Sequence, residues 1–300
     1  MDFLDSGEQV LVTDGGLATE LEARGHDLSD ALWSARLLAD APEEIVAAHR
    51  AFFRAGAVVA TTATYQASFE GFAARGLDRK RTLRLLRRGV EAAETARAEV
   101  SGDGRRRWVA ASVGPYGAFL ADGSEYRGRY GLSVRELRDW HRPRLEALAE
   151  SGADLLALET VPDLDEGRAL VELAAATGFP AWLSYTVEHG RTRAGQPMSE
   201  AFAVAAGVPE ILAVGVNCCA PEEVPAAVEA ARAATGKPVI AYPNSGEGWD
   251  PTRRDWIGPG SYTAERARGW VAEGARVVGG CCRVGPAEIA ELAGVVREAE

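Results

Sequence analysis

The stretch Leu212-Ala213-Val214-Gly215-Val216-Asn217-Cys218-Cys219 is a continuous apolar run that ends abruptly in polar and sulfur-bearing residues. Continuous rather than alternating apolar residues are typical of parallel strands covered on both faces. With this one, the chain has eight such runs: Val10–Val12, Ala57–Ala60, Trp108–Ala111, Leu155–Leu158, Ala181–Leu183, Leu212–Val216, Val239–Ala241 and Val277–Val278. Eight strands alternating with helices predict an α/β fold, a (β/α)8 TIM barrel that fills residues 1–300 as a single domain.

Helix signals lie between the apolar runs. Pro42 opens one amphipathic segment and Gly56 follows its end, as is common at helix termini. Ser133 with Glu136 predicts a capping box, and Pro143 predicts a kink or a split in the same helix. A doubly wound sheet is the alternative fold, but no G-x-G-x-x-G motif follows a strand, which leaves that fold without its usual ligand site.

Composition excludes several classes of function. The 33 basic and 44 acidic residues give a net charge of −11, and no basic cluster occurs, so neither nucleic acid nor an anionic membrane is expected as a partner. Only Lys80 and Lys237 could form a Schiff base. No apolar stretch is long enough for a membrane helix, and the N-terminus does not resemble a signal peptide. Four cysteines in two adjacent pairs favour a cytoplasmic protein with reduced thiols.

The residues directly after each apolar run are the candidate site, because the carboxyl ends of the strands carry the active site of a barrel. These strand ends are Thr13–Gly16, Thr61–Thr64, Glu159–Thr160, Ser184–Thr186, Asn217–Cys219, Tyr242–Ser245 and Gly279–Cys282. All four cysteines fall on the sixth and eighth predicted strands. Strands two apart in a closed barrel are near enough for their loops to share one ion.

Cysteine thiolates on two rigid strand ends suit Zn²⁺, which prefers four tetrahedral ligands. Neighbouring side chains on a regular strand point to opposite faces. We expect Gly279-Gly280 to give the backbone the freedom to turn both Cys281 and Cys282 to one point. The alternatives are that the cysteines are small buried hydrophobes, or that the two pairs are bridged by a disulfide.

Two carboxylates, Asp14 and Glu159, end apolar runs, and they are candidates for binding the ammonium group of an amino acid. The alternative for Asp14 is that it caps the following helix. Glu159 follows a wholly apolar run, where burying a charged carboxylate costs free energy unless the carboxylate binds a partner. The four histidines lie away from the strand ends and are expected to be surface or packing residues.

Several motifs together resemble a known family. Asp14–Leu21 (DGGLATEL), Gly215–Cys218 (GVNC) and Gly279–Arg283 (GGCCR) are similar to the signature of the homocysteine S-methyltransferases. Ser112–Gly128 and Tyr242–Glu247 resemble the bacterial and plant branch, which uses S-methylmethionine and to some extent S-adenosylmethionine. The likeness runs from about Val10 to the C-terminus. The sequence departs from the family pattern at Val284-Gly285-Pro286, in a loop.

The resemblance implies a zinc-dependent barrel enzyme that methylates the thiolate of L-homocysteine and gives methionine. It implies one Zn²⁺ per chain held by Cys218, Cys281 and Cys282, with Cys219 a bystander. It implies substrate contacts from the following residues: Asp14, Gly15, Gly16, Glu159, Asn217 and Asn244. Asp14 and Glu159 are expected to hold the ammonium group, and the amides near Gly15-Gly16 to face the carboxylate. No catalytic residue is expected beyond the zinc-bound substrate thiolate, because the leaving thioether needs no general acid.

The methyl donor is expected to be a sulfonium, with S-methylmethionine preferred. Ser184, Thr186 and Asn244 would supply polar groups beside the metal. Betaine would need a cage of aromatic rings, for which Tyr185 and Tyr242 are too few. Two alternatives stay open: a betaine–homocysteine methyltransferase, and a non-enzymatic zinc or thiol-redox protein in which all four cysteines close around one metal. The sequence does not predict the oligomeric state.

Overall fold

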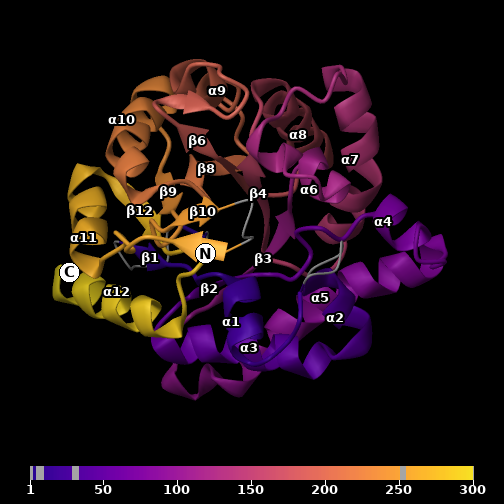
Figure 1. Cartoon of the computed structure of the whole chain (residues 1–300), viewed down its shortest axis with the longest axis horizontal. Helices are drawn as coiled ribbons and strands as arrows, with labels where there is room; N and C mark the ends of the chain where they lie inside the picture. The colour runs from indigo at the N-terminus through magenta and orange to yellow at the C-terminus, as the bar shows by residue number, and fades with distance from the viewer. Residues whose placement is uncertain (1–2, 5–9, 29–33, 251–254, 300) are drawn as a thin grey trace.

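Eight parallel strands form a barrel surrounded by helices in the computed structural model, which describes residues 3–4, 10–28, 34–250 and 255–299 (Figure 1). The strands are hydrogen-bonded in the order β1-β12-β9-β8-β5-β4-β3-β2. A parallel bridge between Thr13 and Val59 joins the first strand to the second, with a 2.7 Å bond from Val58 N to Val12 O beside it. The predicted (β/α)8 barrel is confirmed, and the doubly wound alternative, which would leave two open edges, is wrong.

The barrel strands coincide with the eight predicted apolar runs. They are β1 (Leu11–Val12), β2 (Val59–Thr61), β3 (Trp108–Val113), β4 (Leu155–Val161), β5 (Ala181–Tyr185), β8 (Ile211–Asn217), β9 (Val239–Tyr242) and β12 (Ala275–Val278). The helices are α1 (Leu17–Ala23), α2 (Ser34–Asp40), α3 (Pro42–Ala55), α4 (Phe69–Ala73), α5 (Arg79–Glu99), α6 (Tyr116–Leu120), α7 (Val134–Ala149), α8 (Leu164–Thr177), α9 (Met198–Ala203), α10 (Val224–Thr235), α11 (Ala264–Glu273) and α12 (Pro286–Ala299). Three short 3₁₀ helices are η1 (Ser101–Asp103), η2 (Ser124–Tyr126) and η3 (Pro221–Glu223).

The helix-end predictions hold with one exception. Gly56 ends α3 in the left-handed conformation, at φ 109°. Ser133 and Glu136 form the predicted capping box at the start of α7. Pro143 does not split that helix, which runs without a break from Val134 to Ala149, and the other possibility, a kink at Pro143, stays a prediction. In the part of the chain that the structure describes, no helix combines the length and apolar character that crossing a membrane requires.

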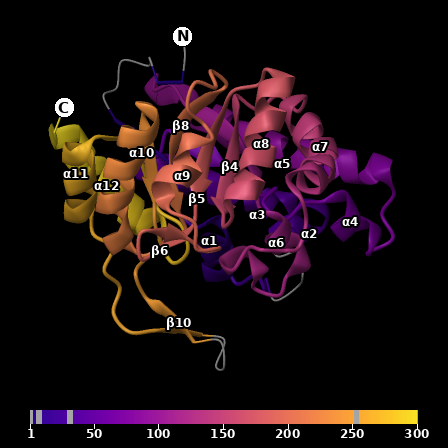
Figure 2. The ribbon, with the colours of Figure 1, turned by 90° about the horizontal axis from the view of Figure 1, so that it is seen from above.

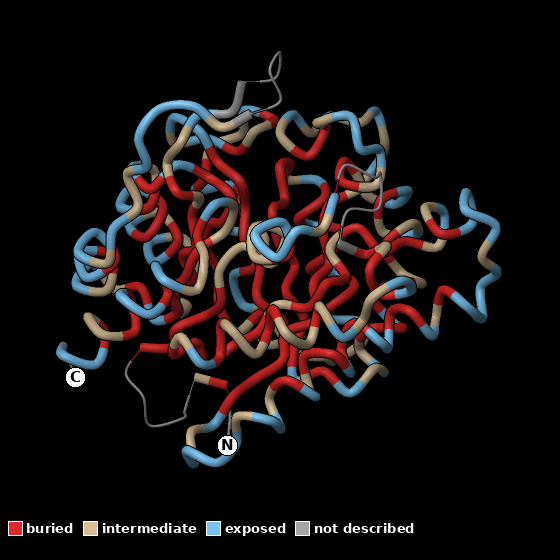
Figure 3. The backbone as a smooth tube through the Cα atoms, turned by 60° about the horizontal axis from the view of Figure 1, so that its bottom comes forward, coloured by how far each residue is buried: buried red, intermediate tan, exposed pale blue. Residues whose placement is uncertain are grey.

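Side chains alternate between two cores, one inside the barrel and one between strands and helices. On β4, Leu155 and Ala157 pack inside, whereas Leu156 and Leu158 face the helices. Glu159 continues the inward series, so the two-residue period of the strand aims its carboxylate along the barrel axis. Figure 3 shows buried segments gathered through the middle of the molecule, with exposed residues mainly on the turns and helices around them.

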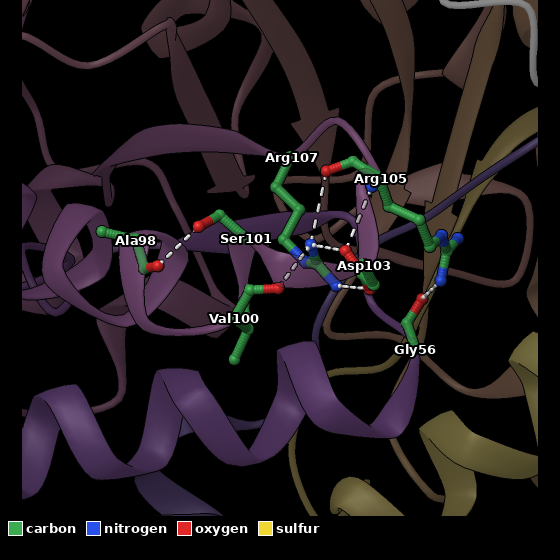
Figure 4. A network of polar contacts seen from close by, with 7 residues as sticks. All are labelled: Gly56, Ala98, Val100, Ser101, Asp103, Arg105 and Arg107. Atoms are coloured by element: carbon green, nitrogen blue, oxygen red, sulfur yellow. Dashed lines mark hydrogen bonds and ion pairs between the residues drawn. The ribbon is translucent and has the colours of Figure 1, made fainter.

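The amino-terminal end of the barrel is closed. Phe3 packs edge-on against Trp108, with ring centroids 5.6 Å apart, and stacks on Trp182 at 6.2 Å. At the same end, Arg107 donates to both carboxylate oxygens of Asp103 and so ties β3 to η1 (Figure 4). A ligand must therefore enter from the carboxyl ends of the strands.

Two hairpins beyond the barrel strands were not predicted. They are β6 (Val187–Glu188) with β7 (Arg191–Thr192), and β10 (Gly248–Asp250) with β11 (Asp255–Ile257). Figure 2 shows the β10 hairpin projecting from the end of the barrel opposite the N-terminus. It follows directly after the seventh barrel strand, so it belongs to the loops that surround the candidate site.

Candidate active site

Three thiols converge at the carboxyl ends of β8 and β12. The Sγ atoms of Cys218, Cys281 and Cys282 all lie within 4.8 Å of one another, and those of Cys218 and Cys282 are 3.7 Å apart. Tetrahedral coordination with Zn–S near 2.3 Å would separate the sulfurs by about 3.8 Å. The three thiols therefore fit a metal such as Zn²⁺ in their present positions, and three protein ligands leave the fourth position for a substrate.

Cys219 does not belong to this group. Cys218 adopts a left-handed conformation, with φ 52°, which breaks the strand alternation and turns Cys219 outward into the core between sheet and helices. Burial raises the pKa of the Cys219 thiol. All four cysteines are free thiols, so the disulfide alternative is wrong, and so is the closed four-cysteine site.

Replacing Cys219 by alanine is therefore expected to leave metal content and activity unchanged. The buried thiol packs as a small apolar group, so its loss should lower the free energy of unfolding by only ~1 kcal/mol. Metal analysis and thermal denaturation of the purified Cys219→Ala protein check this. Loss of metal from that variant would show instead that Cys219 is a fourth metal ligand.

The glycines before Cys281 serve close packing rather than unusual torsions. Neither Gly279 nor Gly280 has a positive φ, which corrects the prediction that their torsional freedom turns the cysteines. A Cβ on Gly279 would lie 2.2 Å from the Thr13 side chain, and one on Gly280 would lie 2.2 Å from Val284. The loop after β12 therefore fits against β1 only because these residues lack side chains.

Asn244 holds the same loop in place. Its side-chain Oδ1 accepts a hydrogen bond of 3.1 Å from the backbone N–H of Cys282, and its own N–H donates to the carbonyl of Cys219 at 2.9 Å. Asn244 is not among the residues that line the pocket. The side chain of Asn244 thus positions the cysteine loop, and its contact with substrate stays a prediction.

Asp14 and Glu159 line one pocket with the three thiols. Asp14 is 3% exposed and accepts hydrogen bonds from the Thr61 amide at 2.7 Å and from the Thr61 hydroxyl at 3.0 Å. The N-cap of α1 is Gly16 and has no side-chain cap, so the capping alternative for Asp14 is wrong. Desolvation by burial raises the pKa of Asp14 to about 7.

Glu159 is equally enclosed. It accepts hydrogen bonds from the Ser112 hydroxyl and, at 3.1 Å, from the hydroxyl of Tyr242. Burial raises its pKa to about 7, and the charge of Asp14 contributes in the same direction. Two buried carboxylates that act on each other without a cation between them are costly to ionise. A bound ammonium would relieve that cost.

Gly15 and Gly16 also line the pocket. The N–H of Gly16 donates to the carbonyl of Val284 at 2.9 Å, so this amide serves the loop itself. A Cβ on Gly15 would meet the Val284 carbonyl oxygen at 2.2 Å, and one on Gly16 would meet that of Cys281 at 2.5 Å. These glycines thus let the loop after β1 lie against the cysteine loop.

Asn217 lies below the pocket rather than in it. Its side chain is fully buried, accepts hydrogen bonds from the Thr160 N–H at 2.7 Å and the Ser184 hydroxyl at 2.8 Å, and donates to the Thr160 hydroxyl at 2.7 Å. Thr160 has a positive φ of 57°. Asn217 therefore holds Thr160, the residue next to Glu159, in its left-handed conformation, and its contact with substrate stays a prediction.

Tyr65 and Tyr126 are pocket tyrosines that sequence reasoning missed. Tyr65 and Tyr126 line the pocket together with Tyr242, and the Tyr126 hydroxyl lies 3.2 Å from the Cys218 Sγ. Tyr185, named in the sequence analysis, instead faces the helices and donates to the carbonyl of Ala201 at 3.0 Å. Strand alternation predicts this outward position, because Trp182 on the same strand faces inward.

The hydroxyl groups predicted to lie beside the metal form hydrogen bonds with other residues of the protein. The Ser184 hydroxyl is bonded to Asn217 and Tyr242, and the Thr186 hydroxyl donates to the carbonyl of Cys218 at 3.0 Å. All four histidines lie in the described part of the chain, and none lines the pocket. The site therefore offers thiols, carboxylates and phenols, with no imidazole to act as a general acid.

The fold and the site define a barrel protein with a three-thiol centre beside two buried carboxylates. A sequence profile described as homocysteine S-methyltransferase matches residues 11–296. The chain belongs to the homocysteine S-methyltransferase family and is a methyltransferase. This confirms the resemblance inferred from the DGGLATEL, GVNC and GGCCR motifs.

Relatives match over almost the whole chain. It is 46% identical to the homocysteine S-methyltransferase of Escherichia coli, over 95% of this chain and 94% of that protein. It is 45% identical to the homocysteine S-methyltransferase YbgG of Bacillus subtilis, over 96% and 95%. The crystal structure of the metallated form of the E. coli homocysteine methyltransferase MmuM has a TM-score of 0.87 to this chain, covering 97% and 98% of the two chains at 44% identity.

Proposed function

We propose that this enzyme transfers a methyl group from a sulfonium donor to the sulfur of L-homocysteine, giving methionine, with one Zn²⁺ per chain held by Cys218, Cys281 and Cys282. The observation that carries the proposal is the placement of three converging thiols and two buried carboxylates in one pocket. We assign the activity to the whole chain as a single domain. The free state of all four cysteines supports a cytoplasmic location, where thiols stay reduced.

Zinc suits this donor set because soft thiolates select it and the sulfur spacing matches tetrahedral geometry. When bound, the ion would supply an open coordination position and would lower the pKa of a thiol that occupies it. The protein contributes the rigid loops. Asn244 fixes the backbone at Cys282. Gly279 lets the cysteine loop lie against Thr13 after β1, and Gly280 leaves room for the side chain of Val284 in the same loop.

The amino-acid part of homocysteine is assigned to the opposite groups of the pocket. Asp14 and Glu159 would bind the ammonium group, whose charge stabilises both carboxylates in the ionised form. The Gly15 amide is the candidate donor to the substrate carboxylate, since the Gly16 amide is bonded to Val284. Holding both ends of the substrate would place its sulfur at the cysteine cluster in one orientation.

A sulfonium donor fits the charge of the site. Thiolates and carboxylates attract a cation, and methyl transfer from sulfur releases a neutral thioether that needs no proton. The absence of histidine from the pocket-lining residues agrees with this chemistry. The protein therefore has to align two sulfur atoms with the methyl between them, and not to move a proton to a leaving group.

S-methylmethionine is the donor we propose, with S-adenosylmethionine slower and betaine inactive. Betaine would need ring faces arranged as a cage around a quaternary ammonium. Of the three tyrosines in the pocket, Tyr126 directs its hydroxyl to Cys218 and Tyr242 directs its hydroxyl to Glu159. They present oxygen atoms to the site, which favours hydrogen bonding to an amino-acid tail over a closed aromatic cage.

We expect kcat/KM with homocysteine to fall in the order S-methylmethionine, S-adenosylmethionine, betaine, because a donor that fits poorly misaligns its methyl group with the thiolate. Methionine formation by the purified zinc-loaded enzyme, measured with each donor in turn, tests this order. Turnover with betaine as fast as with S-methylmethionine would assign the enzyme to the betaine-using branch. No turnover with either sulfonium would overturn the proposed function.

A further inference from the structure

The phenol of Tyr242 lies at the centre of a hydrogen-bond network inside the barrel. Tyr242 is the last residue of β9, is 3% exposed and lines the pocket. Its hydroxyl oxygen lies 3.1 Å from Glu159 Oε2, 3.0 Å from Trp182 Nε1 and 2.7 Å from the Ser184 hydroxyl. Because β5 and β8 separate β9 from β4 in the sheet, this side chain spans two intervening strands to reach Glu159.

The chemistry of the partners fixes the direction of these hydrogen bonds. The indole N–H of Trp182 can only donate, so the phenol oxygen accepts from it. Burial raises the pKa of the Tyr242 phenol well above its usual range, so the phenol keeps its proton. An ionised Glu159 can only accept, and it therefore receives a hydrogen bond from Tyr242.

Ser184 does not take this proton from the carboxylate. Its hydroxyl donates to Asn217 Oδ1 at 2.8 Å, and that oxygen is fixed in place because it also accepts from the Thr160 N–H. A hydrogen bond to an anionic acceptor is stronger than one to a neutral hydroxyl. The proton of Tyr242 is therefore directed to Glu159.

Trp182 is anchored in the inner core of the barrel. It is fully buried, its indole stacks on Phe3 with ring centroids 6.2 Å apart, and it meets the Tyr242 ring edge-on at 6.1 Å. A donor on a ring packed in this way has little freedom to move. Trp182 therefore fixes the phenol oxygen of Tyr242 from within the barrel.

The two oxygens of the Glu159 carboxylate are held from two different strands. Oε1 accepts from Ser112 on β3, and Oε2 accepts from Tyr242 on β9. Each carboxylate oxygen keeps a further lone pair, which an ammonium group could occupy. A carboxylate held in one orientation binds its ligand without losing rotational freedom at that moment.

We propose that Tyr242 and Trp182 are positioning residues for homocysteine binding: Trp182 holds the phenol of Tyr242, and Tyr242 orients the carboxylate of Glu159 toward the substrate ammonium. This inference rests on the proposed function, in which Glu159 binds that group. Both residues act through the carboxylate and not on the reacting sulfur or methyl group. Their contribution therefore belongs to homocysteine binding and not to the methyl-transfer step.

Steady-state kinetics of Tyr242→Phe, with both substrates varied, measure this contribution. The change removes the hydroxyl and keeps the ring that packs against Trp182. We expect the homocysteine KM to rise about tenfold, with kcat and the KM for S-methylmethionine unchanged, because Glu159 loses one of its two hydroxyl donors. Trp182→Phe, which keeps the Tyr242 hydroxyl but removes its anchor, should raise the same KM by a smaller factor.

The double variant Tyr242→Phe/Glu159→Gln separates an indirect role of Tyr242 from a direct one. If Tyr242 acts through Glu159, the homocysteine KM of the double variant should equal that of Glu159→Gln alone. Effects of the two changes that multiply would show that Tyr242 binds the substrate itself, and would overturn the proposal.

Tyr185→Phe is the matched control, because it makes the same change at a buried tyrosine on the strand of Trp182. The Tyr185 hydroxyl donates to the carbonyl of Ala201 at 3.0 Å, on the side of the helices. Both Tyr→Phe variants leave one buried partner without its hydrogen bond, so both should lose stability, but Tyr185→Phe should keep both KM values.

An unchanged homocysteine KM in Tyr242→Phe, an equal rise in Tyr185→Phe, or an unfolded Tyr242→Phe protein would mark the Tyr242 hydroxyl as structural and overturn the positioning role. The proposed function has a separate criterion, because it fails only when the wild-type enzyme turns over no sulfonium donor.

Discussion

Replacing Cys281 by alanine is expected to remove the metal and the methyltransferase activity together. Only three thiols converge at the strand ends, and two remaining thiolates cannot complete a tetrahedral site that also binds substrate. The expected loss of turnover is complete within detection. Zinc content by elemental analysis and methionine formation, measured on one preparation, check the result.

The same change at Cys218 or Cys282 should have the same effect, whereas Cys219→Ala serves as the control with a thiol one residue away. All these variants should fold, because two apolar cores hold the closed barrel together and the three thiols lie at the carboxyl ends of its strands. Full zinc occupancy in Cys281→Ala would show that the ion is held elsewhere and would remove the basis for the assigned ligands.

Glu159→Gln is expected to weaken homocysteine binding by about ten- to a hundredfold. The glutamine keeps the size of the side chain and can accept from one of the two hydroxyls, of Ser112 and Tyr242, while its amide group donates to the other, but it removes one charge-assisted hydrogen bond to the substrate ammonium. Such a bond contributes roughly 1.5–3 kcal/mol. Assays at pH 8 keep the carboxylates of Asp14 and Glu159 ionised, because the pKa of each is about 7.

The control for Glu159→Gln is Glu166→Gln, which changes a fully buried carboxylate outside the pocket. Glu166 accepts from the Tyr116 amide and contacts His141 at 2.8 Å, so its loss should lower stability without a selective effect on homocysteine. An unchanged homocysteine KM in a well-folded Glu159→Gln protein would assign Glu159 to structure and leave Asp14 as the sole ammonium ligand.

Strand positions were predictable because burial on both faces leaves a local signature. Each of the eight apolar runs became a barrel strand, and the residue after each run reached the carboxyl end where loops gather. The cysteine pairs and both carboxylates were found in this way. The two-residue period also placed Glu159 inward, in series with Leu155 and Ala157.

Contacts between distant loops were not predictable in the same way. Asn217 and Asn244 occupy strand ends as the pocket-lining carboxylates do, yet their side chains form hydrogen bonds with Thr160 and Cys282. Tyr65 and Tyr126 lie beyond the strand ends, in segments with no periodic signal. Only the packing of several loops at one mouth brings them beside the thiols.

The sequence by itself determined the number of strands, the end of the barrel that carries the chemistry, and the residue types available there, because these depend on local hydrophobic pattern and spacing. The tertiary structure decided which thiols meet. A left-handed Cys218 reverses the strand alternation and turns Cys219 away, and glycines without side chains let the loops of β1 and β12 touch. Backbone torsions at one residue and contacts across the closed barrel have no local signature, since they are set by the packing of segments far apart in the chain.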